Sequence, residues 1–260
     1  MRKAVLLLTT AFLCLPAIAL AADPVPGAQT AAPATAFSDA QRAAIEDIIK
    51  DYLTNKHPEV MAQGLQTLQQ REQESAEAKT KSEVDKAKDR IFNDPNTPFV
   101  GNPKGNVTVV EFYDYQCGYC KMSEEATEKL IREDKNLKFV FKDFPILGPA
   151  SAEAAKASLA SVKQGKFQAF HDALMNKKDH LTSDLIYQTA KDAGLDVDKL
   201  KKDMNDSSVT DEINATLKLG QDIGARGTPM FIIGDTIVPG AMQYEQLKQA
   251  ISDARSGKKS

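Results

Sequence analysis

From Phe99 onward, the pattern of apolar and polar positions alternates between strands and helices. Apolar and β-branched runs predict strands at 107–113, 137–141, 230–233 and 236–238, and the last two form a hairpin around Gly234-Asp235. Apolar residues at helical spacing predict helices at 117–132, 151–164, 167–175, 183–193, 197–204, 211–223 and 244–254. Because a helix joins the first two strands, they form a parallel pair, and the pattern predicts an α/β domain.

The preceding segment is helical in a different way. Ser38, with Gln41 three residues later, caps a helix whose apolar positions fall on one face: Ile45, Ile48, Ile49, Tyr52 and Leu53. A second helix starts at Pro58 and carries Val60, Met61, Leu65 and Leu68, before a polar, charged stretch at 69–90 that indicates a solvated helical arm. The apolar face either packs back on its own domain or forms an oligomer interface. The polar arm separates it from any other core, which favours a homodimer or homotrimer.

The first residues have the features of a secretory signal. Arg2 and Lys3 precede an apolar run from Ala4 to Leu15, and small residues around Ala21 form a cleavage site. The run is shorter than a membrane-spanning helix requires, so we expect an exported protein. The expected organisation is a signal peptide at 1–21, a disordered Ala/Pro/Thr-rich tether at 22–37, a helical oligomerisation region and arm at 38–93, and an α/β domain at 94–260 with a helical insert at about 149–210.

Charge argues against nucleic acid as a partner. Residues 1–21 contain two of the 33 basic residues and none of the 36 acidic ones, so the mature chain carries a net charge of −5. No basic run is long enough to indicate a nucleic-acid surface.

The chemistry of the chain centres on Cys117 and Cys120, because Cys14 lies in the signal. The pair follows the first predicted strand and opens the next helix, where unpaired backbone N–H groups and the helix dipole lower a thiol's pKa. Cys117 is therefore the predicted nucleophile, and Cys120, one helical turn later, resolves the mixed disulfide. A structural disulfide and a zinc site are the alternatives. Zinc needs two further ligands, and the three histidines, His57, His171 and His180, show no fitting spacing. No phosphate loop or metal-ligand cluster accompanies the dithiol, so the sequence predicts no metal and no cofactor beyond the two sulfurs.

Glu111 interrupts the otherwise apolar strand six residues before Cys117. Burial would raise its pKa and allow it to exchange a proton with Cys120, with Lys142 as its charge partner. The alternative places Glu111 on the exposed face of an edge strand.

Three features together resemble one known family. Val109-Val110-Glu111-Phe112 leads into Cys117-Gly118-Tyr119-Cys120, Gly227-Thr228-Pro229 precedes the hairpin, and a helical segment lies between them. This combination resembles the bacterial periplasmic DsbA-like thiol:disulfide interchange family. The amino-terminal helices and Gly101-Asn102-Pro103 are similar to its subgroup of ScsC-type proteins and outer-membrane-associated antigens.

The resemblance implies a thioredoxin fold with an inserted helical domain, preceded by an α-helical oligomerisation arm. It implies a cis Thr228-Pro229 bond facing the dithiol, and client contacts from Gly118, Tyr119, Thr228 and Pro229. It also implies exported cysteine-containing clients and a membrane redox partner, in the periplasm with an outer-membrane association as an additional expectation.

Gly118-Tyr119 between the cysteines and Thr228 before the proline resemble the periplasmic disulfide isomerases. The function expected is therefore disulfide isomerisation with some oxidase activity. The alternatives are a dithiol oxidase and a non-catalytic envelope interaction protein.

Overall fold

The computed structural model describes residues 37–257, and the chain divides into two compact units between Leu65 and Gln66. The expected signal peptide and nearly all of the expected tether lie outside the described residues. Within 37–257, no helix is both long enough and apolar enough to cross a bilayer.

The first unit begins with α1 (Asp39–Asp51) and a π-helical turn (Tyr52–Lys56). The predicted capping box is confirmed: the Gln41 N–H donates to Ser38 Oγ at 3.3 Å, and the Ser38 N–H donates to the Gln41 side-chain oxygen at 2.9 Å. No residue of α1 is buried. The apolar face is open instead, with Ile48 67% exposed and Ile49 51% exposed.

α2 (Pro58–Lys86) confirms the predicted long helix and its start at Pro58. Most of it is exposed, but Val84 near its end is only 2% exposed. Val84 and Ile91, on the short α3 (Lys88–Phe92), pack with residues of the sheet. The last turn of the predicted solvated arm is therefore part of a core.

The second unit is built on a five-stranded sheet with the order β1-β3-β2-β4-β5. Its strands are β1 (Phe99–Gly101), β2 (Val107–Tyr113), β3 (Leu137–Asp143), β4 (Met230–Ile233) and β5 (Thr236–Pro239). β2 and β3 are parallel, as the strand–helix–strand unit predicted, and β4 and β5 are antiparallel, as the hairpin predicted. The antiparallel pairs β1–β3 and β2–β4 were not predicted from the sequence. β1 was not predicted, because three residues are too few to show a strand period.

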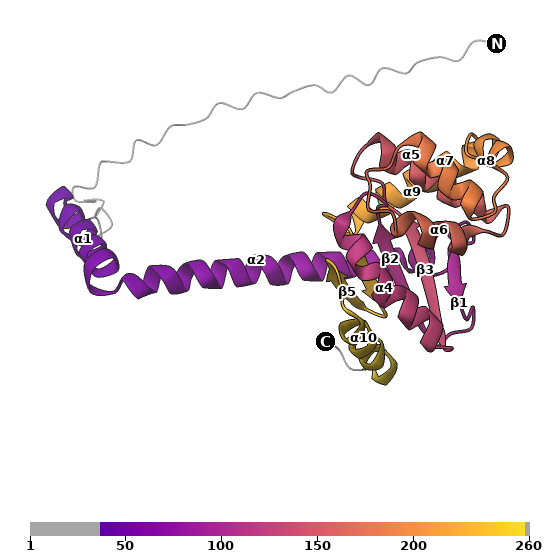
Figure 1. Ribbon diagram of the computed structural model, residues 1–260. Coiled ribbons are helices and arrows are strands. Elements are labelled where there is room, and N and C mark those ends of the chain that lie inside the picture. Colours follow the sequence, from indigo (N-terminus) through magenta and orange to yellow (C-terminus); the bar gives the residue numbers. More distant parts are fainter. Residues whose placement is uncertain (1–36, 258–260) are drawn as a thin grey trace, which may run out of the picture. The chain divides into compact units, whose positions relative to one another are not determined.

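Helices cover both faces of this sheet (Figure 1). Those after β2 are α4 (Gly118–Glu133), α5 (Pro149–Val162), α6 (Phe167–Met175), α7 (Ser183–Asp192), α8 (Val197–Asp203), α9 (Ser207–Asp222) and α10 (Tyr244–Ser256). Helices α5 to α8 gather on one side of the sheet, within the range expected for the insert (Figure 1).

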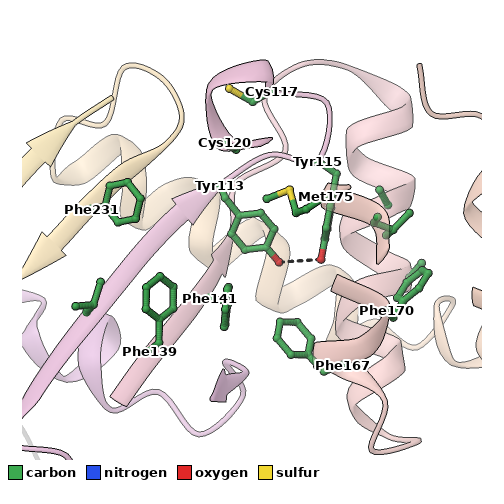
Figure 2. Packing of buried hydrophobic residues seen from close by; sticks show 14 of the residues in the cluster. Tyr113, Tyr115, Cys117, Cys120, Phe139, Phe141, Phe167, Phe170, Met175 and Phe231 are labelled. Atoms are coloured by element: carbon green, nitrogen blue, oxygen red, sulfur yellow. Dashed lines mark hydrogen bonds between the residues drawn. The ribbon is translucent and has the colours of Figure 1, made fainter. Parts of the chain in front are cut away.

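Alternation along β2 divides its side chains between two cores, because successive residues of a strand point to opposite faces. Val109 and Tyr113 face the larger core, in which aromatic side chains from the sheet meet those of α6 (Figure 2). Val110 and Phe112 face the smaller core with α9, α3 and the end of α2. Glu111 shares the face of Val109 and Tyr113, so its carboxyl group points toward the side that carries α4.

Candidate active site

The turn between β2 and α4 is organised by a buried carboxylate, Asp114. One of its oxygens accepts hydrogen bonds from the Gln116 N–H at 2.8 Å and from Ser151 Oγ at 2.7 Å. The other accepts from the N–H groups of Ile146 and Leu147 at 2.9 and 3.0 Å. Asp114 thus fixes both the loop that precedes the dithiol and the loop after β3. Sequence reasoning missed it, although an acidic residue directly after an apolar strand is a readable signal.

Cys117 is the N-cap residue of α4, as predicted, and both cysteines are free thiols. The pKa of Cys117 is lowered to about 5, first by a hydrogen bond from the Cys120 thiol, then by the Thr228 side chain and by the backbone N–H groups of Cys120 and Tyr119, with burial opposing. Burial raises the pKa of Cys120 far above its usual range, and the hydrogen bond to Cys117 adds to this effect. The two thiols therefore differ: one is a thiolate at neutral pH, and the other keeps its proton.

Glu111 lies in the interior of the sheet, because β2 pairs with β3 on one side and with β4 on the other. Its side chain is 1% exposed, which excludes the edge-strand alternative. Burial raises its pKa well above the usual value, and negative charge on Glu124 and Cys117 raises it further. One of its carboxyl oxygens has no hydrogen-bond partner among the described residues.

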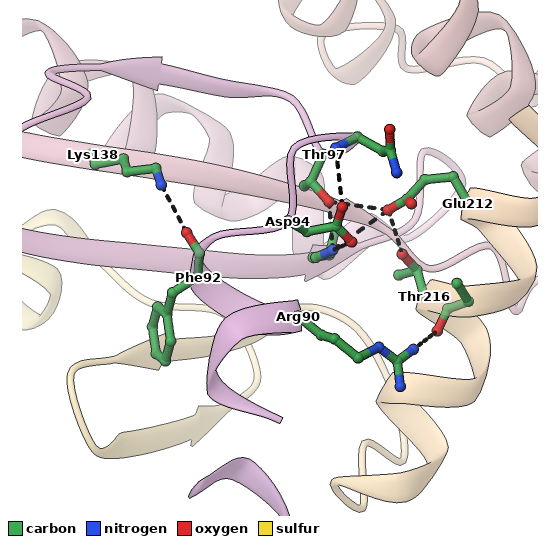
Figure 3. A network of polar contacts seen from close by, with 10 residues as sticks. Arg90, Phe92, Asp94, Thr97, Lys138, Glu212 and Thr216 are labelled. Atoms are coloured by element: carbon green, nitrogen blue, oxygen red, sulfur yellow. Dashed lines mark hydrogen bonds and ion pairs between the residues drawn. The ribbon is translucent and has the colours of Figure 1, made fainter. Parts of the chain in front are cut away.

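The prediction that Lys142 is the charge partner of Glu111 is wrong. Lys142 pairs in register with Phe112, so it points to the opposite face of the sheet. There its ammonium group contacts Asp94 at 3.1 Å and Glu212 at 3.5 Å, and it also donates to Thr97. Figure 3 shows that Asp94, Thr97 and Glu212 converge at this point. Lys142 therefore stabilises the contact between residues 94–97 and α9. Strand β3 places no cation beside Glu111.

The Thr228-Pro229 peptide bond is cis, as the resemblance implied, and it lies beside the dithiol. The Cys117 thiol donates to the Thr228 carbonyl oxygen at 3.1 Å. This bond exists only while Cys117 is protonated, so ionisation frees the carbonyl for another donor. Between the cysteines, Tyr119 is 64% exposed and Gly118 faces open space. Gly118, Tyr119, Thr228 and Pro229 thus border Cys117.

Two side chains attach the insert to the dithiol. Gln116 accepts from the Leu181 N–H at 2.9 Å, and its amide nitrogen lies 2.8 Å from His180 Nδ1. Lys121 donates to the Lys177 carbonyl at 2.6 Å. The segment 177–181, between α6 and α7, is therefore tied to both ends of the Cys117–Cys120 turn.

Comparisons with known proteins agree with this architecture. Residues 108–252 match the model of the DSBA-like thioredoxin domain, and residues 41–74 match that of the copper resistance protein ScsC N-terminal domain. A thioredoxin-like oxidoreductase from Silicibacter pomeroyi is 42% identical with a TM-score of 0.63, covering 65% of this chain and 97% of its own. A linker-deletion mutant of ScsC from Proteus mirabilis is 28% identical with a TM-score of 0.66, covering 86% of this chain and 99% of its own.

Some relatives are much longer. A Na(+)/H(+) antiporter NhaA from Salinispora tropica is 28% identical over 164 residues, which cover 62% of this chain but 25% of the antiporter. The shared part is thus a domain that also occurs in larger proteins. The predicted fold is confirmed, a thioredoxin fold of the DsbA type with inserted helices and an amino-terminal helical arm. The chain belongs to the DSBA-like thioredoxin domain family and carries an amino-terminal segment of the ScsC type.

Proposed function

We propose that this protein is a thiol:disulfide oxidoreductase that rearranges incorrect disulfides in exported proteins. The observation that carries the proposal is the contrast between the two thiols: the pKa of Cys117 is about 5 at the start of α4, and Cys120 is completely buried with a raised pKa. Such a pair provides a nucleophile at neutral pH and keeps the second sulfur protonated until it is needed.

The exchange follows from these positions. The Cys117 thiolate attacks one sulfur of a client disulfide, which forms a mixed disulfide and releases a client thiolate. In isomerisation, another client thiolate attacks the client sulfur of the mixed disulfide, and Cys117 leaves as a thiolate. Alternatively Cys120 attacks Cys117 and releases the client reduced, leaving the Cys117–Cys120 disulfide in the protein.

Glu111 takes part as the proton acceptor of Cys120. Burial, the charge on Glu124 and the Cys117 thiolate all raise the pKa of Glu111, so the carboxyl group holds its proton in the reduced protein. Formation of the mixed disulfide removes the last of these effects, which lowers the pKa of Glu111 and favours release of its proton to solvent. The carboxylate so formed accepts the Cys120 proton as this sulfur attacks.

Client binding involves the residues that border Cys117. The Thr228 carbonyl, freed when Cys117 ionises, accepts from a backbone N–H of an extended client segment. Pro229 has no N–H and leaves the approach open, and the exposed Tyr119 ring with Gly118 beside it gives an apolar contact that does not depend on client sequence.

The amino-terminal helices associate as a homodimer or homotrimer. Support comes from the ScsC N-terminal match at 41–74 and from the exposed apolar face of α1. Ile49→Asp would place a charge in that face and reduce the solution mass to that of a monomer, as measured by light scattering. Ala43→Asp, on the opposite face of α1, is the matched control and keeps the oligomer. An unchanged mass for Ile49→Asp would exclude this interface.

A second candidate, a dithiol oxidase, is favoured by the low pKa of Cys117, because stabilising the thiolate stabilises the reduced protein and makes its disulfide more oxidising. In both cases we place the protein in the periplasm, with a membrane redox partner.

Two assays distinguish the candidates. The reduced protein is tested for reactivation of scrambled, fully oxidised ribonuclease, and the oxidised protein for oxidation of reduced ribonuclease, with Cys117→Ala as the control. An isomerase gives substantial Cys117-dependent reactivation, and Ile49→Asp reduces this activity more than the oxidation. Oxidation without reactivation would support the oxidase, and neither activity would contradict both.

A further inference from the structure

Behind the dithiol, three potential ligands converge between α4 and α6. Glu124, one turn after Cys120, is 4% exposed, and His171 on α6 is 1% exposed. Together with the half-buried Asp172, their ligand atoms all lie within 4.8 Å of one another. This proximity could not be read from the sequence, because Glu124 and His171 lie on different helices far apart along the chain.

The hydrogen bonds around His171 determine which nitrogen faces the carboxylates. Tyr115 OH lies 2.9 Å from His171 Nδ1 and donates its own proton to Ser158 Oγ at 2.8 Å. Tyr115 OH must therefore accept from His171 Nδ1–H, which places the lone pair of the neutral imidazole on Nε2. A second group that fixes the other nitrogen in this way is typical of histidines that bind metals.

His171 Nε2 points toward Glu124 Oε1 at 3.6 Å, and it has no hydrogen-bond partner among the described residues. A lone pair and a carboxylate thus face each other in a buried space. Two such acceptors repel unless a proton or a cation lies between them. With Asp172 as a second carboxylate, the cluster has two negative charges and no Lys or Arg among its members.

The separations fit a small d-block cation. Zinc binds imidazole nitrogen and carboxylate oxygen at about 2.0–2.2 Å, so tetrahedral ligand atoms lie about 3.3–3.6 Å apart. The contact between His171 and Glu124 already has this spacing, and a small rotation of Asp172 would complete a three-ligand site. Asp172 also lines a surface pocket of about 300 Å³, together with Glu128, Ile131, Arg132 and Gln168, so its carboxyl group connects the buried cluster with the surface.

We propose that Glu124, His171 and Asp172 bind one Zn²⁺ ion. The ion neutralises the two carboxylates and joins α6 of the insert to α4, the helix that carries the dithiol. The two sulfurs are not ligands of this ion, and the proposal does not depend on the redox function proposed above.

The test uses the full-length mature chain with Cys117→Ser and Cys120→Ser, because thiolates would themselves bind zinc. Equilibrium dialysis measures bound Zn²⁺, and Co²⁺ substitution reports the ligands by its visible spectrum. We expect one ion per chain in this background. Asp172→Asn, at a half-buried position where folding is not at risk, should weaken Zn²⁺ binding more than tenfold, and Glu124→Gln should do the same.

Glu125→Gln is the matched control, because Glu125 is exposed on the same helix, and it should bind Zn²⁺ as the background does. Circular dichroism verifies that each variant is folded. The proposal is overturned if the background binds no Zn²⁺ at micromolar concentration. It is also overturned if Asp172→Asn retains full affinity, or if excess Mg²⁺ displaces the zinc, since Mg²⁺ would then be held by carboxylates without the imidazole.

Discussion

The hydrogen bond from Cys120 to Cys117 is the contact that we expect to control reactivity, and Cys120→Ala removes it. It is the largest of the effects that lower the pKa of Cys117 to about 5. A hydrogen bond to a charged group contributes about 1.5–3 kcal/mol, and one pKa unit corresponds to about 1.36 kcal/mol. The variant should therefore raise the pKa of Cys117 by about 1–2 units, while the remaining backbone donors keep it below that of a free thiol.

The assay is the rate of alkylation of Cys117 by iodoacetamide across the pH range. The midpoint of the profile should move upward by the same 1–2 units. The plateau at high pH should rise about threefold to tenfold, because thiolate nucleophilicity increases with pKa with a Brønsted coefficient of about 0.4–0.5. The two profiles then cross, which a change in access to the sulfur alone would not produce.

Cys120→Ser is the matched control, because its hydroxyl can still donate to the Cys117 sulfur and should shift the midpoint less than alanine does. The reasoning is refuted if Cys120→Ala leaves the midpoint unchanged, or if the unaltered protein titrates near the ordinary thiol value of about 8.5.

Three further predictions concern stability. The folded-state pKa of Cys117 is depressed, so the stabilisation from its thiolate is complete above the ordinary thiol pKa of about 8.5 and is lost as the pH falls through about 5. The melting temperature of the reduced protein relative to Cys117→Ala should therefore decrease over that interval, and a constant difference would contradict this prediction. Glu111 has a raised pKa, so it destabilises the fold above its usual value of 4.5, and Glu111→Gln should raise the melting temperature at pH 7 but not at pH 4. Lys142→Met leaves the carboxylates of Asp94 and Glu212 without their cation and should lower the free energy of unfolding, measured in urea, by about 3–5 kcal/mol. Lys138→Met is the control, because it removes only a hydrogen bond to a backbone carbonyl and should lower that free energy much less.

The sequence was sufficient to predict those parts of the fold that have a periodic or turn signal in a short segment of the chain. The parallel pair, the hairpin and the capped start of α1 each have a periodic or a turn signal, and Cys117 could be placed at the N-terminus of α4 because its strand and helix were both readable. The short β1 carries no such signal, since its pairing with β3 is a tertiary contact.

Pairings between distant residues could not be predicted in the same way. Lys142 was expected beside Glu111, but strand alternation directs it to Asp94 and Glu212, which lie 48 and 70 residues away in the sequence. The convergence of Glu124 with His171 depends on how α6 packs on α4. The packing of whole helices and strands determines which partners a buried polar group contacts. Those partners lie far away in the sequence, so no local pattern predicts them.

The central claim is that Cys117 alone attacks client disulfides and that Cys120 resolves the product. Its most direct test is mass spectrometry of Cys120→Ala after incubation with scrambled ribonuclease, with Cys117→Ala as the comparison. We predict that ribonuclease becomes attached to Cys117 in the first variant and that no adduct accumulates in the second. An adduct that forms on Cys120 in Cys117→Ala at a similar rate, or no adduct on Cys117 in Cys120→Ala, would contradict the assignment of the nucleophile.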